Sequence, residues 1–128
     1  MAENKKILLV DDDEFLLDMY SIKFREAGFT VELSRGGEDA LNFLRQGMTP
    51  DVILLDIVMP NIDGFEFLRI VGKENLKKAS KIIVLSNLGQ KEDIEKGLAL
   101  GASDYIVKAN STPSEVVNKV KELLAKAS

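Results

Sequence analysis

Short apolar blocks alternate with longer amphipathic segments along this chain. Five blocks have the length of a β-strand, at residues 7–10, 29–34, 52–55, 82–85 and 103–107. A short apolar run bounded by turn residues is typical of a strand buried on both faces of a parallel sheet. Residues 29–34 (FTVELS) instead alternate between apolar and polar positions, which predicts a strand at the edge of that sheet.

The segments between these blocks have helical periodicity. Apolar residues three and four apart predict helices over residues 14–27, 38–46, 64–71, 90–100 and from Pro113 onward. In the fourth helix, Ile94 and Leu98 are the predicted inward positions. Thr112 and Glu115 have the spacing of a capping box at the start of the last helix. Alternating strands and helices predict an α/β fold, a parallel sheet with helices on both faces.

Polar residues follow each predicted strand, and those after the second strand, an outer one, are set aside. Asp11 and Asp12 follow the first strand, Asp56 the third, Ser86 the fourth and Lys108 the fifth. Open parallel sheets bind ligands beyond the carboxyl ends of their strands. We therefore expect three carboxylates, a hydroxyl and a lysine to meet in one cleft.

Each of these residues also has a simpler interpretation. The acidic pair could favour the start of the first helix by about 0.3–1 kcal/mol. Asp56 could cap the turn that follows it, Ser86 could be an ordinary turn residue, and Lys108 a solvated lysine. The combination favours a site, because two carboxylates about 4 Å apart repel by roughly 4 kcal/mol at an effective dielectric near 20. Three of them together require a cation or a raised pKa.

The residue types predict phosphoryl chemistry at this site. Carboxylate oxygens select a hard cation, Mg²⁺ or Ca²⁺, and Mg²⁺ suits a few carboxylates together with waters and a phosphate. A lysine and a hydroxyl opposite the metal match the remaining oxygens of a phosphoryl group. A carboxylate beside the metal can act as the nucleophile, which gives an acyl phosphate.

Composition narrows the function classes. The chain has 128 residues, about one domain, and its net charge of −4 argues against a basic nucleic-acid-binding face. It contains no cysteine and no histidine, which excludes thiol chemistry, Ser-His and Cys-His catalysis, and a phosphohistidine of its own. We find no run of membrane-spanning length and no signal peptide, so the expected location is the cytoplasm, with no membrane contact.

Several short motifs in order resemble the receiver domain of two-component response regulators. They are residues 7–12 (ILLVDD), Leu55-Asp56 with Met59-Pro60 and Asp63-Gly64, Ser86, and residues 101–108 (GASDYIVK). The resemblance covers essentially the whole chain. It implies a (βα)5 flavodoxin-like fold of strand order 2-1-3-4-5. We expect a single receiver domain over residues 1–128 with no output domain.

The resemblance also implies a role for each residue of the acidic cluster. Asp56 matches the phosphoacceptor. Asp11 and Asp12 match the acidic pair that holds Mg²⁺, or Mn²⁺ in its place, with Asp12 as the preferred direct ligand. Asp56 itself and the backbone carbonyl of Val58 match the other protein ligands of the metal.

The remaining matched positions concern binding and switching. Lys108 matches the lysine that pairs with the acceptor carboxylate or its phosphate, and Ser86 the hydroxyl that reaches the phosphoryl group. Tyr105 matches the aromatic switch whose rotamer follows that hydroxyl and changes the face formed by the fourth helix, fifth strand and fifth helix. The implied phosphoryl donor is a sensor histidine kinase or a histidine phosphotransfer protein.

The leading interpretation is a signalling switch that acts on a downstream protein target in trans, without turnover of an external substrate. A phosphorelay intermediate or a phosphate sink is the alternative. An Asp-nucleophile phosphohydrolase is less favoured, because it needs an aspartate at the position of Val58. A pseudo-receiver that binds partners without phosphorylation is the last alternative. Because Ala109 stands where receivers usually have proline, we predict a trans Lys108–Ala109 bond.

Overall fold

The computed structural model describes residues 5–126 and contains one parallel sheet. Its strands run in the order β2-β1-β3-β4-β5, and every neighbouring pair is parallel. The strands are β1 (Lys6–Val10), β2 (Thr30–Ser34), β3 (Val52–Leu55), β4 (Lys81–Ser86) and β5 (Asp104–Val107). The predicted fold class and the edge position of β2 are confirmed. The predicted domain range of 1–128 includes residues 1–4 and 127–128, which lie outside the described residues.

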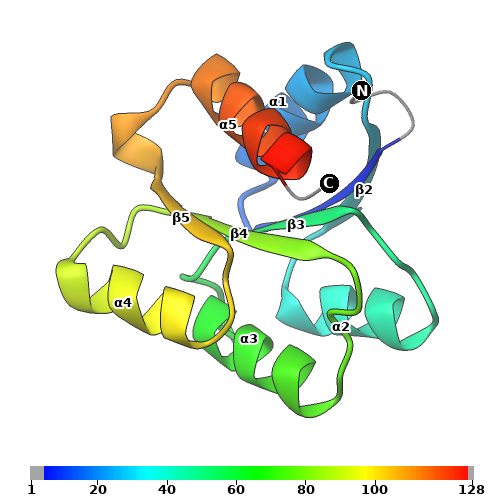
Figure 1. Ribbon diagram of the computed structural model, residues 1–128, viewed down its shortest axis with the longest axis vertical. Helices are drawn as coiled ribbons and strands as arrows, with labels where there is room; N and C mark the ends of the chain where they lie inside the picture. The colour runs from blue at the N-terminus through cyan, green and yellow to red at the C-terminus, as the bar shows by residue number, and fades with distance from the viewer. Residues whose placement is uncertain (1–4, 127–128) are drawn as a thin grey trace.

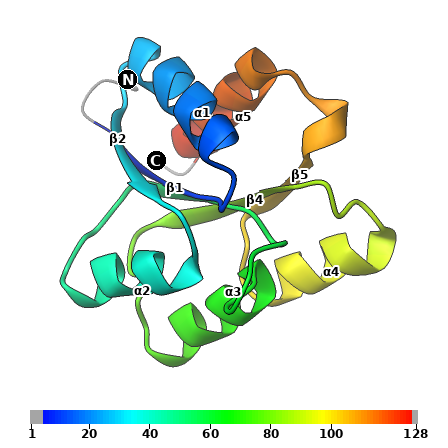
Figure 2. The same cartoon turned by 180° about the vertical axis from the view of Figure 1, so that it is seen from behind.

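The helices form two layers around the sheet. They are α1 (Glu14–Glu26), α2 (Gly37–Arg45), α3 (Gly64–Lys73), α4 (Lys91–Ala99) and α5 (Pro113–Lys126). Helices α1 and α5 cover one face, and α2, α3 and α4 cover the other (Figures 1 and 2). A short 3₁₀ turn, η1 (Lys108–Asn110), connects β5 to the loop before α5. Within residues 5–126 we find no helix with the length and apolar character needed to span a membrane.

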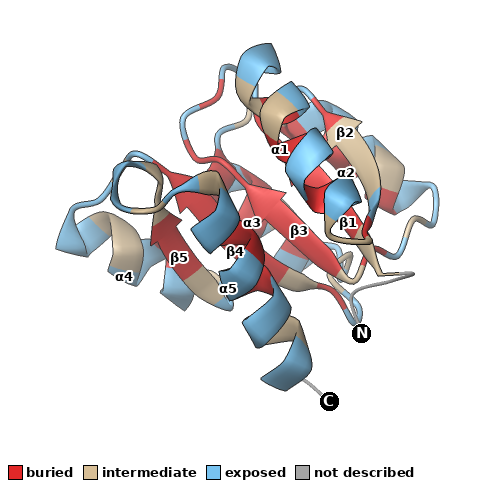
Figure 3. Ribbon diagram, turned by 90° about the horizontal axis from the view of Figure 1, so that it is seen from above, coloured by how far each residue is buried: buried red, intermediate tan, exposed pale blue. Residues whose placement is uncertain are grey.

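Two apolar layers hold this arrangement together, one on each face of the sheet. Side chains alternate between the faces along a strand, so Leu8 and Ile53 pack in the layer under α2 and α3. Their neighbours Ile7 and Leu54 pack in the layer under α1 and α5. The central strands β1, β3 and β4 are therefore buried on both faces, as the red colour in Figure 3 shows, whereas β2 is mostly half-buried. A sheet held from both sides is a rigid support for the residues at its edge.

The strand register brings the polar strand ends together. Val10 pairs with Leu55, so Asp11 and Asp56 leave the sheet at the same level. Ser86 pairs with Val107, which places the last residue of β4 beside the residue before Lys108. The carboxyl edge of the four strands β1, β3, β4 and β5 is thus one continuous surface.

One inward position in α4 was predicted wrongly. Leu98 is 44% exposed, whereas Gly97 is buried. The inward ridge of α4 runs from Ile94 by a step of three to Gly97, not by a step of four to Leu98. Helical spacing allows both steps, and its hydrophobic side chain favoured Leu98 as the inward position. Gly97 has no side chain to indicate burial, and its role is to let another residue approach the helix.

The region before α5 has the predicted local structure. Thr112 Oγ1 accepts a hydrogen bond from the Glu115 N–H at 3.2 Å, and Glu115 Oε1 accepts one from the Thr112 N–H at 2.8 Å. The capping box is therefore confirmed. The Lys108–Ala109 bond is trans, as predicted, since no cis peptide bond occurs in the described part of the chain.

Candidate functional site

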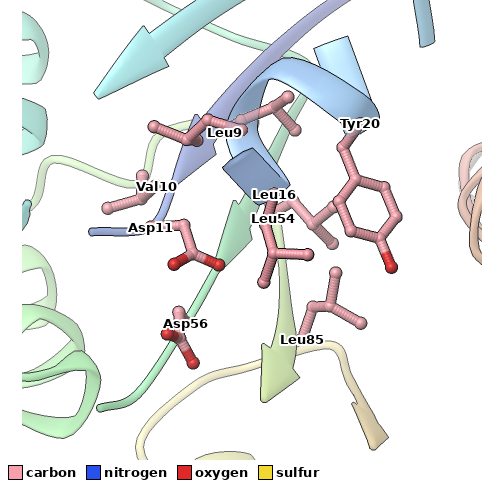
Figure 4. Close-up of a pocket in the computed structure, with 9 residues that line it drawn as sticks. Leu9, Val10, Asp11, Leu16, Tyr20, Leu54, Asp56 and Leu85 are labelled. Atoms are coloured by element: carbon pink, nitrogen blue, oxygen red, sulfur yellow. The ribbon is translucent and has the colours of Figure 1, made fainter. Parts of the chain in front are cut away.

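Three carboxylates converge at the carboxyl edge of the sheet. One oxygen from each of Asp11, Asp12 and Asp56 lies within 4.8 Å of the others. Asp11 and Asp56 are buried, whereas Asp12 is exposed. Figure 4 shows the side chains of Asp11 and Asp56 facing one another from the ends of β1 and β3. The structure thus brings together the acidic residues that the sequence analysis selected.

Lys108 reaches into this cluster from the end of β5. Its Nζ lies 2.9 Å from Asp11 Oδ2 and 3.6 Å from Asp56 Oδ2. The Lys108 side chain is only 12% exposed, so its interpretation as a solvated lysine is wrong. A single ammonium group between two buried carboxylates compensates part of their charge.

Burial and charge oppose one another in the pKa of Asp56. Burial raises the pKa of the Asp56 carboxyl, and the negative charge of Asp11 raises it further. Lys108, the Ser86 hydroxyl and the Ile57 N–H oppose this rise, and that N–H donates to Asp56 Oδ1 at 2.8 Å. The net direction is upward, because the favourable partners do not fully replace the lost hydration.

The pKa of Lys108 follows from the same cluster. Burial lowers the pKa of the Lys108 ammonium, but the hydrogen bond to Asp11 and the charges of Asp56 and Asp11 outweigh burial and raise it. The lysine is therefore held in its charged form. A fixed positive charge at this position attracts an anionic group that approaches Asp56.

Ser86 and Tyr105 are joined through a single backbone residue. Ser86 is fully buried, and its Oγ accepts a hydrogen bond from the Leu88 N–H at 3.3 Å. The carbonyl of Leu88 accepts a hydrogen bond from the Tyr105 hydroxyl at 2.6 Å. Ser86 and Tyr105 are therefore linked by hydrogen bonds to the same residue of the β4–α4 loop.

The donor set of this edge fits a hard divalent cation. It consists of carboxylate oxygens from Asp11, Asp12 and Asp56, and the sequence contains neither a cysteine thiol nor a histidine imidazole. Oxygen ligands of this kind suit Mg²⁺, and an exposed Asp12 leaves room for coordinated waters on the outer side.

Comparison with known proteins agrees with this geometry. The family model for the response regulator receiver domain matches residues 7–121. The chain belongs to the response regulator receiver family. It is 36% identical over 124 residues to the probable transcriptional regulator ycf27 of Guillardia theta, with 97% of this chain and 47% of the relative aligned. The chain spans about half the length of the curated relatives it matches.

Two solved receiver structures have the same fold. The receiver domain of the Francisella response regulator 1452 is 33% identical, with a TM-score of 0.86 over 98% of this chain and 100% of that one. A CheY-like receiver domain protein from Methanospirillum hungatei is 29% identical, with a TM-score of 0.88 over 98% of this chain and 97% of that one. Receiver domains are in general signalling modules rather than enzymes, and they bind Mg²⁺ at an acidic pocket.

In this receiver the predicted ligand at Val58 lies in the loop after Asp56. The Val58 side chain is 60% exposed, so it does not contribute to the core. Gly64 N–H closes the loop on the Ile57 carbonyl at 2.9 Å, and Asp63 Oδ1 caps α3 through the Glu66 N–H at 2.9 Å. These two hydrogen bonds hold the end of the loop beside the acidic cluster. The role of the Val58 carbonyl as a ligand stays a prediction.

A small cavity lies beside Asp11 and Asp56, on the face of the sheet that α1 covers. Its volume is about 10 Å³, and Asp11, Asp56 and Tyr20 are among its lining residues (Figure 4). A space of that size holds a single water. The receiver therefore has no room for an organic substrate here, and a reacting group must reach Asp56 from the open side of the cluster.

Several contributions to the site were not predicted from the sequence. The Ile57 N–H and both backbone groups of Leu88 leave no signature in residue type, because every non-proline residue carries them. Gly97 is a different case. A Cβ built there would lie 3.0 Å from Cδ2 of Tyr105. The absence of a side chain at Gly97 therefore leaves the space that the tyrosine ring occupies. The step of three from Ile94 could have revealed it.

The raised pKa of Asp56 predicts a pH-dependent effect of the Asp56→Asn substitution in metal-free buffer. Above the ordinary pKa of an aspartate, the unfolded chain releases its proton more readily than the folded chain does. Stability therefore falls as the pH rises toward the raised pKa of folded Asp56. We expect the Asp56→Asn variant to have the higher free energy of unfolding at pH 7, and the difference to vanish below the ordinary pKa. Urea unfolding in EDTA measures it.

The control for this prediction is Asp18→Asn, which removes an exposed carboxylate from α1. It should leave the pH profile of stability close to that of the wild type. A lower stability of Asp56→Asn at pH 7 would show that the buried charge is fully compensated without a metal.

The contact between Gly97 and Tyr105 predicts that Gly97→Ala displaces the tyrosine ring. Alanine normally stabilises a helix interior by about 1 kcal/mol relative to glycine. Here that gain should be lost, because the added Cβ meets the ring. Gly72→Ala in α3 is the matched control, since nothing lies within 4 Å of a Cβ built there. We expect it to stabilise the protein.

Labelling the tyrosines with ¹³C gives a direct readout of this displacement, because the chain has two tyrosines. The Tyr105 ring resonance, assigned through Tyr105→Phe, should shift in Gly97→Ala and stay in place in Gly72→Ala. Burial, with the charges of Asp93 and Asp56, also raises the pKa of Tyr105 to about 12. An unmoved resonance and equal stabilisation by both substitutions would contradict the role of Gly97.

Proposed function

We propose that this receiver accepts a phosphoryl group on Asp56 and acts as a signalling switch. The donor would be a phosphohistidine on a sensor histidine kinase or on a histidine phosphotransfer protein. The observation that carries the proposal is the cluster of Asp11, Asp12 and Asp56 around Lys108, whose Nζ lies 2.9 Å from Asp11 and 3.6 Å from Asp56. The absence of histidine from this chain fits a donor on another protein.

In the proposed transfer, an oxygen of the Asp56 carboxylate attacks phosphorus. The new bond is an acyl phosphate O–P bond. The P–N bond of the phosphohistidine breaks, and its electron pair stays on the imidazole nitrogen of the donor. Mg²⁺ bound by the acidic cluster would neutralise charge on the phosphoryl oxygens. Asp56 must be ionised to attack, so the charge of Lys108, which opposes the rise in its pKa, favours the reactive form.

Lys108 and Ser86 would take over the phosphoryl oxygens after transfer. The Lys108 ammonium already lies 3.6 Å from an Asp56 oxygen, and Ser86 is near enough to lower the pKa of that carboxyl. A charged donor to a phosphoryl oxygen is a strong hydrogen bond. The backbone N–H of Ile57 holds the other carboxylate oxygen at 2.8 Å, which orients the attacking atom.

Phosphorylation would then be transmitted along the β4–α4 loop. It places about two negative charges beside Ser86. The Ser86 hydroxyl would turn toward the phosphoryl group. It would thereby lose the 3.3 Å hydrogen bond that it accepts from the Leu88 N–H. Tyr105 is bonded to the carbonyl of the same residue at 2.6 Å, so its position would follow. The face formed by α4, β5 and α5 would change its affinity for a downstream protein.

The alternatives to this proposal fall into two classes, one that shares the chemistry at Asp56 and one that does not. A phosphorelay intermediate or a phosphate sink shares the chemistry at Asp56 and differs only in its partner. A phosphohydrolase would need an acid at residue 58, and the exposed Val58 has no proton to donate. The geometry therefore favours a single transfer over turnover.

The proposal predicts that Asp56 becomes labelled by a small acyl phosphate in the presence of Mg²⁺. Intact mass spectrometry should show the addition of one phosphoryl group, and peptide mapping after borohydride reduction should locate it at Asp56. Asp56→Asn should remove the label. Asp18→Asn, on the exposed side of α1, should retain it.

Other outcomes of this labelling experiment would favour another function or another acceptor. A wild-type chain that stays unlabelled would favour a pseudo-receiver, and a label that persists in Asp56→Asn would place the acceptor elsewhere. Continuous release of phosphate from a generic phosphomonoester would favour the phosphohydrolase. Labelling of Asp56 without Mg²⁺ would contradict the role of the acidic cluster.

A further inference from the structure

The Gly36-Gly37 pair at the start of α2 contains two glycines in very different surroundings. Gly36 is the N-cap, with extended backbone that any residue adopts, and nothing lies within 4 Å of a Cβ built there. A Cβ on Gly37 would lie 2.9 Å from Cγ2 and 3.0 Å from the carbonyl oxygen of Ile62. Real Cβ contacts are almost never this short, so the second position requires glycine as long as Ile62 stays in place.

Ile62 belongs to the loop that follows Asp56. The loop folds back on itself: a Cβ on Gly64, which follows the loop, would lie 2.5 Å from the carbonyl oxygen of Asp56, which precedes it. Asn61, next to Ile62, has a φ of 68°, a left-handed conformation that asparagine adopts more readily than most other residues with a side chain. The backbone of this loop is thus tightly turned on both sides of Ile62.

The start of α2 provides a firm support for this loop. Ser34, at the buried end of β2, donates its hydroxyl hydrogen to the Gly36 carbonyl at 2.9 Å. Ala40, Leu41 and Leu44 anchor the rest of the helix in the core. Because the helix is fixed at both its first peptide and its buried face, an added Cβ on Gly37 would displace Ile62 rather than α2.

We propose that Gly37 is a positioning residue for the phosphoryl-accepting site. Its bare backbone lets the first turn of α2 support Ile62, and Ile62 holds the loop that aims the Ile57 N–H at Asp56 and presents the Val58 carbonyl to the metal. The inference rests on the proposed function, because it assigns a role toward Mg²⁺ and phosphoryl transfer. It makes α2, which contributes no side chain to the acidic cluster, part of the support of the site.

The test compares Gly37→Ala with Gly36→Ala in the full chain. Titration of Mg²⁺, followed by amide NMR, measures affinity without any phosphoryl donor. Groups that orient metal ligands typically contribute 10–100-fold to affinity. We expect Gly37→Ala to weaken Mg²⁺ binding about tenfold and to slow labelling by an acyl phosphate. Gly36→Ala should change Mg²⁺ affinity less than twofold, because its Cβ enters open space.

A second substitution separates positioning from a general loss of stability. Ile62→Ala removes the Cγ2 atom that the added Cβ would meet. Because Gly37 acts through Ile62, Ile62→Ala alone should weaken Mg²⁺ binding about as much as Gly37→Ala does, and the double variant should bind Mg²⁺ no more weakly than either single variant. A merely structural role would give losses of affinity that add up in the double variant, alongside additive losses of stability.

Three results would overturn the inference. Equal Mg²⁺ affinity in Gly37→Ala and the wild type would reject the positioning role and leave the proposed function intact. A wild-type chain that binds no Mg²⁺ would reject both. Losses of Mg²⁺ affinity that add up in the Gly37→Ala, Ile62→Ala double variant would assign the effect to general instability and also reject the inference.

Discussion

The repulsion among three carboxylates at one edge of the sheet is the constraint on which this structure depends. The strand register places Asp11 and Asp56 side by side, and both are buried. Such an arrangement is unfavourable unless positive charge is supplied. Lys108 supplies one charge from the far end of the sheet, and the cluster is completed by a metal ion when one is bound. The protein therefore concentrates negative charge at the edge where we propose that a cation and a phosphoryl group bind.

The rest of the fold divides into a rigid part and a responsive part. Strands buried on both faces, with α1 and α5 on one side and α2, α3 and α4 on the other, keep the strand ends in place. In the proposed switch the β4–α4 loop is the responsive part, since Leu88 bonds Ser86 through its N–H and Tyr105 through its carbonyl. The bare backbone of Gly97 leaves space on α4 for the tyrosine ring. A charge placed at the rigid edge would then be converted into a change on the surface around Tyr105.

The sequence predicted the features that side chains determine, and it missed those that the backbone determines. Fully apolar runs such as residues 52–55 identified the buried strands, and parallel strands place their carboxyl ends at one edge, so the residues of the cluster could be selected. The prediction that Leu98 points inward was wrong, because helical spacing permits steps of three and of four from Ile94. The Ile57 N–H and the Leu88 peptide could not be predicted from residue type. Their importance follows from loop conformations that only the folded chain shows.

The dependence of stability on Mg²⁺ measures the electrostatic cost of the three carboxylates and its compensation by a cation in one experiment. The free energy of unfolding should be measured by urea titration at pH 7 over increasing Mg²⁺, for the wild type and for Asp12→Asn. For the wild type we predict a rise that approaches about 1.4 kcal/mol for each tenfold increase in Mg²⁺ above the dissociation constant. The Asp12→Asn variant should show a much weaker rise. A wild-type stability that does not change with Mg²⁺, or an equal rise in both proteins, would contradict the account.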